Sequence, residues 1–240
     1  MVDIAQQATL HPGSAGDAGA SRAPVPLTMI DRGQWRALAQ RAIEANGYYL
    51  PAWELAVSAT ARNRTNASAL PAFDGTSSRL IGLMPVMSLW RALKIPLPAL
   101  VSAHPYGTLC SPLIDRDASI EAATQLLQQA REAGAHALLL NDVALDGAAM
   151  DAIKQVLTRD GLKPRVLSSY FRASLDATQD AETLLREALG TKKLKELRRQ
   201  RHRLEEHGPV TFDVARRIDD IKPALETFLQ LEAGGWKGKR

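Results

Sequence analysis

The strongest chemical signal in the sequence is a run of basic residues from Thr191 to Glu206, TKKLKELRRQRHRLEE. It holds seven of the chain's 30 Lys and Arg residues but only three of its 26 acidic residues, so it accounts for the whole formal net charge of +4. Such a concentrated field attracts an anion, whether a phosphate, a nucleic acid or an acidic partner. Guanidinium groups match phosphate oxygens, which makes part of the run a candidate anion site. The candidate residues are Lys195, Arg198, Arg199 and Arg203.

A solvated surface helix would explain the same run. Leu194, Leu197 and Leu204 would then form a narrow apolar stripe that faces the body of the protein, while the charged side chains lie in water. Arg201 and Glu205, four residues apart, would form a surface ion pair. Both interpretations predict a helix, and they differ only in whether its charges hold a ligand.

Other combinations of reactive side chains are weaker candidates. His104 and Cys110 lie six residues apart and suggest a Cys/His nucleophile, but no third residue orients them and an extended strand would keep them apart. Free cysteines are more often small buried apolar residues. Trp236 is a candidate for lining an acceptor pocket, and packing is the alternative. No metal-ligand spacing recurs, so no metal is expected.

The composition bounds the class of protein. With 45% hydrophobic and 23% charged residues, the chain is typical of a soluble protein with one or two cores. The single cysteine favours a reducing, cytoplasmic location. No apolar window is long enough to cross a membrane, so no membrane span is expected. Residues 1–27, rich in Ala, Gly, Ser and Pro, are predicted to be a disordered leader.

Residues 28–165 alternate between helical and extended patterns, which predicts a mixed α/β (α+β) unit. A first helix is expected to run from Trp35 to the Asn46-Gly47 pair and to pack on a sheet. Pro85 predicts that the apolar run Arg79–Met87 is an edge strand or a bulged one. The remaining expected elements are a strand in Ile95–Ser111, a helix at Ser119–Ala133, a strand at Ala137–Leu140, and a helix at Gly147–Arg159 that Asp146 caps and Gly161 ends.

Residues 166–240 predict a second unit with little sheet. Strands are expected at Val166–Leu175 and Val210–Ala215, and helices at Ala181–Leu189, along the basic run, and after Asp219 and Asp220. Two strands are too few for an independent core, so this part is expected to be the start of a longer domain.

The second unit also resembles a known family. The segments FRASLD, LREALGTKKLKELRRQRHRLEEHGPVTFDVAR and ETFLQLEAGGWKGKR, between Tyr170 and Arg240, are similar to the N-terminal part of the acetyltransferase domain of CelD-like proteins, described with cellulose biosynthesis. These belong to the GNAT superfamily and are related to Fem-type peptidyltransferases, which have two tandem GNAT-like halves. Residues 28–165, with SRLIGLMPV and HPYGTLCSPLID, resemble the first half, and residues 166–240 the incomplete second.

The resemblance implies transfer of an acyl group from acetyl-CoA or another acyl-CoA to an amine or hydroxyl, on a small-molecule, glycan or peptide acceptor linked to polysaccharide or cell-envelope metabolism. In this superfamily a turn of the type Arg/Gln-x-x-Gly-x-Gly/Ala holds the CoA pyrophosphate at a helix N-terminus. The chain contains no such turn, which is expected after Arg240, so an inactive fragment is one expectation. No catalytic residue is identified by the resemblance. The alternative is a non-catalytic module that binds nucleic acid or another polyanion through residues 191–203, with strong salt dependence. The oligomeric state stays open.

Overall fold

The computed structural model describes residues 2–3, 24–61, 67–103, 106–173, 178 and 180–239. The chain divides into two compact units, Met1–Tyr170 and Phe171–Arg240. The sequence places the corresponding boundary at residue 165.

A mixed sheet forms the centre of the first unit. Its strand order is β1-β7-β5-β4-β3-β2, with β6 pairing to β4 beside that path. The pair β5 and β7 is parallel, and the other pairs among the described strands are antiparallel. The mixed α/β class predicted from the sequence is confirmed. The strands are β1 (Val2–Asp3), β2 (Val25–Pro26), β3 (Ser68–Phe73), β4 (Leu80–Ser88), β5 (Ala99–Ser102), β6 (Leu113–Ile114) and β7 (Ala137–Leu139).

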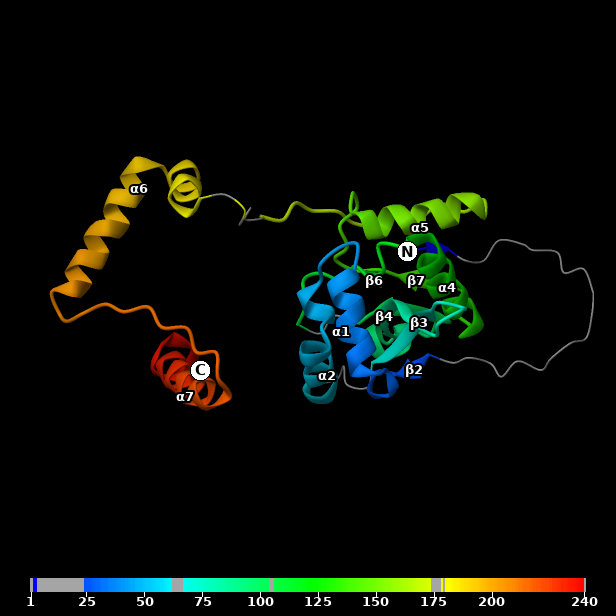
Figure 1. Cartoon of the computed structure of the whole chain (residues 1–240), viewed down its shortest axis with the longest axis horizontal. Helices are drawn as coiled ribbons and strands as arrows, with labels where there is room; N and C mark the ends of the chain where they lie inside the picture. Colours follow the sequence, from blue (N-terminus) through cyan, green and yellow to red (C-terminus); the bar gives the residue numbers. More distant parts are fainter. Residues whose placement is uncertain are drawn as a thin grey trace, which may run out of the picture. The chain divides into compact units, whose positions relative to one another are not determined.

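Helices cover both faces of this sheet. Figure 1 shows α1 (Arg32–Arg41) and α2 (Pro51–Thr60) on one side, and α4 (Ser119–Glu132) and α5 (Ala148–Arg159) on the other. Two apolar cores result, because side chains alternate along the strands. In β4, Met84 belongs to the core under α4 and α5, whereas Leu83 belongs to the core under α1. The short helix α3 (Leu89–Leu93) follows β4 directly.

Pro85 lies in a central strand, so the expectation of an edge strand is wrong. In β4, Pro85 stands opposite Ala69 of β3. Its carbonyl points to the other side, where it accepts a 2.9 Å hydrogen bond from the backbone N–H of Ala103. That side faces the gap between the end of β5 and the start of β6, so the N–H that proline lacks is not needed for the ladder. The alternative of a bulged strand is supported, because the register shifts between Ala72 and Phe73, whose partners in β4 are Gly82 and Leu80.

Several predicted boundaries also need correction. α1 ends at Arg41, and Asn46 instead accepts a hydrogen bond from the N–H of Tyr48 at the start of the 3-10 turn Gly47–Tyr49. Asp146 does not cap α5, whose N-cap is Gly147 with no side-chain hydrogen bond. The helices α4 and α5 and strand β7 lie where the sequence predicts them.

Ordered structure begins before residue 28, although residues 1–27 were expected to form a leader. Val2–Asp3 pairs with β7, Val25–Pro26 pairs with β3, and Leu27–Met29 forms a 3-10 turn with Leu27 buried. Residue 1 and residues 4–23 lie outside the described residues.

The second unit consists of two long helices among its described residues. Helix α6 (Ala181–Glu205) contains a break at Gly190, with φ 68° and ψ 165°, so it forms two segments, as the sequence predicts. Helix α7 (Ile218–Gly234) has Asp219 and Asp220 in its first turn, as expected, and the 3-10 turn Trp236–Lys239 follows it. Among the described residues, no helix has the length and apolar character needed to cross a membrane.

Neither strand predicted within residues 166–240 appears among the residues that the structure describes. Residues 166–173 and 210–215 are extended or irregular, and none of them pairs in a strand ladder. Residues 174 and 175, at the end of the first predicted strand, lie outside the described residues. Aromatic and β-branched residues favour a pleated surface, but a strand also needs a partner backbone, which the described part of this unit does not offer.

Candidate functional site

The parallel strands β5 and β7 bring two chain segments to one edge of the sheet. They run in register, with Ala99 beside Ala137 and Val101 beside Leu139, so their carboxyl ends lie together. The two ends are tied by a hydrogen bond of 3.0 Å from the backbone N–H of Asn141 to the Ser102 hydroxyl. In sheets with parallel strands, ligands bind preferentially outside the carboxyl ends. A ligand site is therefore expected at this edge.

A buried polar cluster lies at these strand ends. The Tyr49 hydroxyl donates a 2.9 Å hydrogen bond to the carbonyl of Ala103, one residue beyond β5. Side-chain hydrogen bonds link Tyr49, Ser102 and the Cys110 thiol. All three residues are buried. We call these three residues and the nearby Glu54 of helix α2 the polar cluster.

Glu54 adds a carboxyl group to the cluster from helix α2. It shares the buried side of that helix with Pro51 and Val57, and the residue is only 2% exposed. Its Oε1 atom has no hydrogen-bond partner among the described residues. Burial raises the pKa of the Glu54 carboxyl from 4.5 to about 8. The charge of the Glu54 carboxylate also raises the pKa of Tyr49 and of Cys110.

Hydrogen bonds to backbone carbonyls hold the residues around the polar cluster in place. Trp35 of α1 donates from Nε1 to the carbonyl of Tyr49 at 2.8 Å. Asn46 donates from its side-chain amide to the carbonyl of Ser111 at 2.8 Å, and the N–H of Cys110 donates to the carbonyl of Asp142 at 3.0 Å. These bonds connect three stretches of chain that are far apart in the sequence. The Tyr170 hydroxyl donates to the Asp142 carboxylate at the same edge.

The ionisable groups of the polar cluster differ in pKa, so they differ in whether they hold a proton near neutral pH. Burial raises the pKa of the Cys110 thiol to about 12, and burial together with the charges of Cys110 and Glu54 raises the pKa of Tyr49 well above 10. Both groups therefore keep their protons near neutral pH, whereas Glu54 exchanges its proton there. A carboxyl group with this pKa suits general acid–base catalysis.

A Cys/His nucleophile is not supported by this geometry. A nucleophilic cysteine needs a lowered pKa, and that of Cys110 is raised. His104, the other member of the suggested pair, lies outside the described residues. Among the described residues, no group of three or more His, Cys, Asp or Glu side chains is placed to hold a metal ion.

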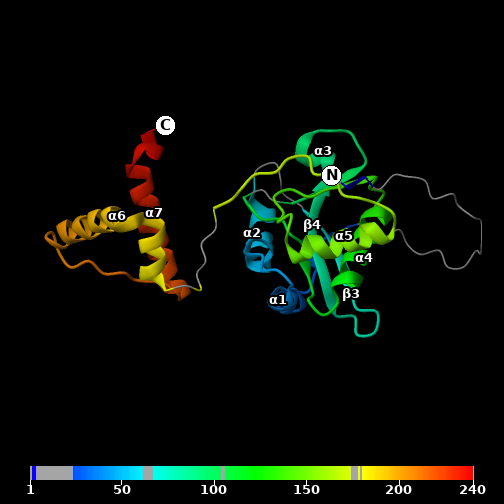
Figure 2. The ribbon, with the colours of Figure 1, turned by 90° about the horizontal axis from the view of Figure 1, so that it is seen from above.

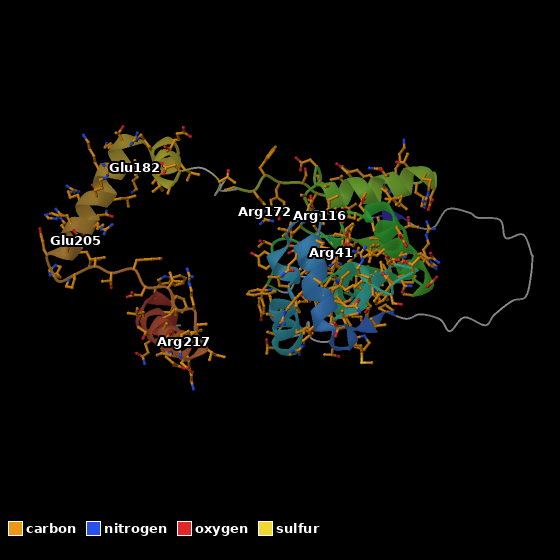
Figure 3. All side chains as sticks on the ribbon, in the orientation of Figure 1. Arg41, Arg116, Arg172, Glu182, Glu205 and Arg217 are labelled. Carbon is orange, nitrogen blue, oxygen red and sulfur yellow. The ribbon has the colours of Figure 1, made fainter. Side chains whose placement is uncertain are left out.

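The anion-binding candidates lie in the second unit, on the part of α6 after Gly190, and all are exposed. Arg198 donates to Glu182 of the first segment at 2.7 Å, and Arg199 donates to Glu196 at 2.7 Å. Figure 3 shows Glu182 in the first segment and Glu205 near the end of the second. Within the described part of the chain, Lys195 and Arg203 have no carboxylate partner.

Four cations of α6 share one helix face. Their spacings of three, four and four residues place them one above another on the helix. Lys192, like Lys195 and Arg203, has no carboxylate partner among the described residues, while Arg199 is paired. We call this set the basic stripe: Lys192, Lys195, Arg199 and Arg203.

The leucines of the second segment lie away from the basic stripe. Leu194 and Leu197 line, with Leu185 of the first segment, a groove of about 370 Å³ between the two segments of α6. Leu204 is exposed. The predicted ion pair between Arg201 and Glu205 is confirmed, with Nε and Oε1 3.0 Å apart.

Trp236 lies on a different element from the other candidates, the 3-10 turn that follows α7, and its side chain is exposed. The sequence missed the polar cluster, whose members come from positions 49 to 110. One local signal was available: Glu54 lies at helical spacing from Pro51 and Val57, in the apolar stretch PAWELAV, where a charged side chain faces the core.

Comparisons with protein-family models, curated proteins and solved structures find no match to this chain.

Proposed function

We propose that the protein is an acyltransferase of the GNAT type, which moves an acyl group from an acyl-CoA such as acetyl-CoA to an amine or hydroxyl acceptor. The observation that carries this proposal is the buried Glu54 carboxyl with a pKa of about 8, whose charge acts on Tyr49, the residue that donates a hydrogen bond to Ala103 just after β5. The similarity of residues 170–240 to CelD-like acetyltransferase domains supports the same reaction class. The acceptor class follows from that similarity: a small molecule, a glycan or a peptide of envelope or polysaccharide metabolism.

Direct transfer to an amine needs one group that removes a proton. The amine nitrogen attacks the thioester carbonyl carbon, the carbon–sulfur bond breaks, and the amine loses a proton while the CoA sulfur gains one. The Glu54 carboxylate accepts the proton from the amine, since its pKa of about 8 is near that of the working solution. The Tyr49 hydroxyl keeps its proton at neutral pH and donates a hydrogen bond to the carbonyl of Ala103, so its part is to hold the end of β5 in place.

The first test is calorimetric titration of acetyl-CoA into the protein, followed by an assay of CoA thiol release with amine acceptors. Glu54→Gln is the informative variant, because glutamine imitates the protonated carboxyl and cannot accept a proton. We expect this variant to bind acetyl-CoA and to lose about 10²-fold or more in turnover. The control is Glu226→Gln on the exposed surface of α7, for which no change is expected. The proposal would be refuted if the protein did not bind acetyl-CoA or if the Glu54→Gln variant kept full activity.

A second candidate function is binding of nucleic acid or another polyanion through the basic stripe. The observation that favours it is the row of exposed cations, three of which have no carboxylate partner among the described residues. Because the stripe has no interleaved aromatic residue, such binding would rest on phosphate attraction and not on base stacking.

Salt dependence separates the two functions. If the stripe binds single-stranded RNA, the affinity falls steeply with salt, and Lys195→Gln together with Arg203→Gln weakens it without affecting acetyl-CoA binding. RNA affinity that stays the same in this double variant would exclude the stripe as the nucleic-acid interface.

A further inference from the structure

The segment from Leu89 to Pro98, LWRALKIPLP, exposes a run of large apolar side chains on the first unit. Trp90 is 53% exposed and Leu97 60%, and Leu93 and Ile95 between them are also exposed. Four large apolar side chains are thus exposed within eight residues, and clusters of exposed apolar side chains mark interaction sites. We call Trp90, Leu93, Ile95 and Leu97 the α3 patch.

The patch is presented by a backbone that is already ordered. Lys94 ends α3 in the left-handed conformation, with its N–H donating to the carbonyl of Trp90 at 2.9 Å. After it, the N–H of Leu97 donates to the carbonyl of Ile95 and that of Ala99 to the carbonyl of Leu97. The N–H of His136 holds the carbonyl of Pro98 at 2.7 Å. Binding therefore requires little ordering of the loop.

Two basic residues belong to the segment that carries the patch. Arg91 and Lys94 lie within it, and the chain has no acidic residue between Asp74 and Asp115. The Lys94 ammonium lies 5.9 Å from the centre of the Trp90 ring, which keeps the cation beside the exposed indole. The patch thus combines tryptophan, aliphatic side chains and two cations. Figure 2 shows α3 at one end of the first unit, with the β3–β4 hairpin at the opposite end.

We propose that the α3 patch docks the protein on the surface of an anionic lipid bilayer. Tryptophan partitions to the boundary between headgroups and acyl chains, and aliphatic side chains insert just below it. Arg91 and Lys94 meet the anionic headgroups. A lipid surface is a better match than a protein groove because the apolar side chains project from a short helix and loop at one end of the unit. This inference stands independently of the acyltransferase proposal.

The test is sedimentation of the protein with vesicles of equal parts phosphatidylcholine and phosphatidylglycerol, and with vesicles of phosphatidylcholine alone. We expect binding to the anionic vesicles and much weaker binding to the neutral ones. The double variant Trp90→Gln and Leu97→Gln should lower the partition coefficient by about tenfold or more. Arg91→Gln with Lys94→Gln should lower it about fivefold for each charge removed, and only on the anionic vesicles.

The matched control replaces two apolar side chains that are exposed elsewhere on the first unit. Met29→Gln with Phe73→Gln removes similar apolar surface outside the patch and should leave vesicle binding unchanged. Failure of the unaltered protein to bind anionic vesicles would overturn the proposal, as would equal binding by the Trp90/Leu97 variant. If binding is instead lost in the Lys195→Gln and Arg203→Gln variant alone, the basic stripe is the lipid contact and the α3 patch is not.

Light scattering tests the alternative that the α3 patch binds a second copy of this chain. A dimer of the unaltered protein that becomes a monomer in the Trp90/Leu97 variant, without vesicle binding, would show that the patch joins two copies and would overturn the lipid proposal.

Discussion

Arg41, the last residue of α1, donates from Nε to the Asp115 carboxylate at 3.0 Å. Asp115 is fully buried, follows β6 directly, and also lies 3.5 Å from a guanidinium nitrogen of Arg79. Arg116 adds a second connection to the end of α1, because its Nε donates to the carbonyl of Arg41 at 3.1 Å. Arg41 and Arg116 are labelled in Figure 3. One carboxylate thus joins the end of a helix to the sheet that the helix covers.

Removing this carboxylate should destabilise the first unit. Asp115→Ala leaves Arg41 without its partner and is expected to lower the free energy of unfolding by about 3 kcal/mol, measured by urea denaturation. Burial raises the pKa of Asp115, but hydrogen bonds from Asp117 and Arg41 and the charges of Arg41 and Arg79 outweigh it, so the pKa lies below 3.8. The stabilisation is therefore present above that pH and is lost as the pH falls through the folded-state pKa. Asp117→Ala, at an exposed side chain, is the control, and an equal loss there would contradict this account.

The Glu54 carboxyl should make stability fall as the pH rises. Its folded-state pKa of about 8 exceeds the ordinary value of 4.5, so the folded protein holds a proton that the unfolded chain releases. The stabilisation is fully present below about pH 4.5 and is lost through about pH 8, with a slope of at most about 1.4 kcal/mol per pH unit. Glu54→Gln should abolish this part of the slope. Denaturation at a series of pH values measures it, and the same slope in protein and variant would show that Glu54 is not buried as described.

A larger side chain at Gly82 should destabilise the first unit. A Cβ atom added there would lie 3.0 Å from the Cβ of Ala72 and 3.2 Å from the Cβ of Ala122, so glycine allows α4 to approach the sheet closely. Gly82→Val is expected to lower the free energy of unfolding by about 1–3 kcal/mol. Gly75→Ala, where an added Cβ would meet nothing within 4 Å, should have little effect. Thermal melts of the two variants compare them, and equal melting temperatures would contradict close packing at Gly82.

Elements with a strong local signal were predictable from the sequence. The apolar period of Ile120 to Ala130 and the glycine at 134, with φ 77°, define α4 without reference to the rest of the chain. The edge-strand alternative for Pro85 failed because the rule against proline in central strands is local, whereas the gap between β5 and β6 that accommodates this proline arises from the tertiary fold. The strands expected at residues 166–175 and 210–215 failed for a related reason, since propensity cannot supply a neighbouring strand.

The candidate sites differ in the same way. The basic stripe lies on one helix, so the spacing of its residues in the sequence is enough to predict that they share a face, and Arg201 pairs with Glu205 as the spacing predicts. The polar cluster depends on β5 and β7 being adjacent and parallel, which brings Ser102 and Asn141 together across 39 positions of sequence. No local pattern encodes that adjacency. What the sequence did offer was the placement of Glu54 on the apolar side of its own helix.

The break at Gly190 sets the angle between the two segments of α6, and this angle sets the direction in which the basic stripe faces. Its φ of 68° with ψ of 165° belongs to a region that only glycine occupies at low cost. The axis of the segment that carries the basic stripe is set at this point. A substitution at Gly190 would redirect the positive potential of the second unit while leaving every charge in place, so the orientation of that potential can evolve separately from its strength.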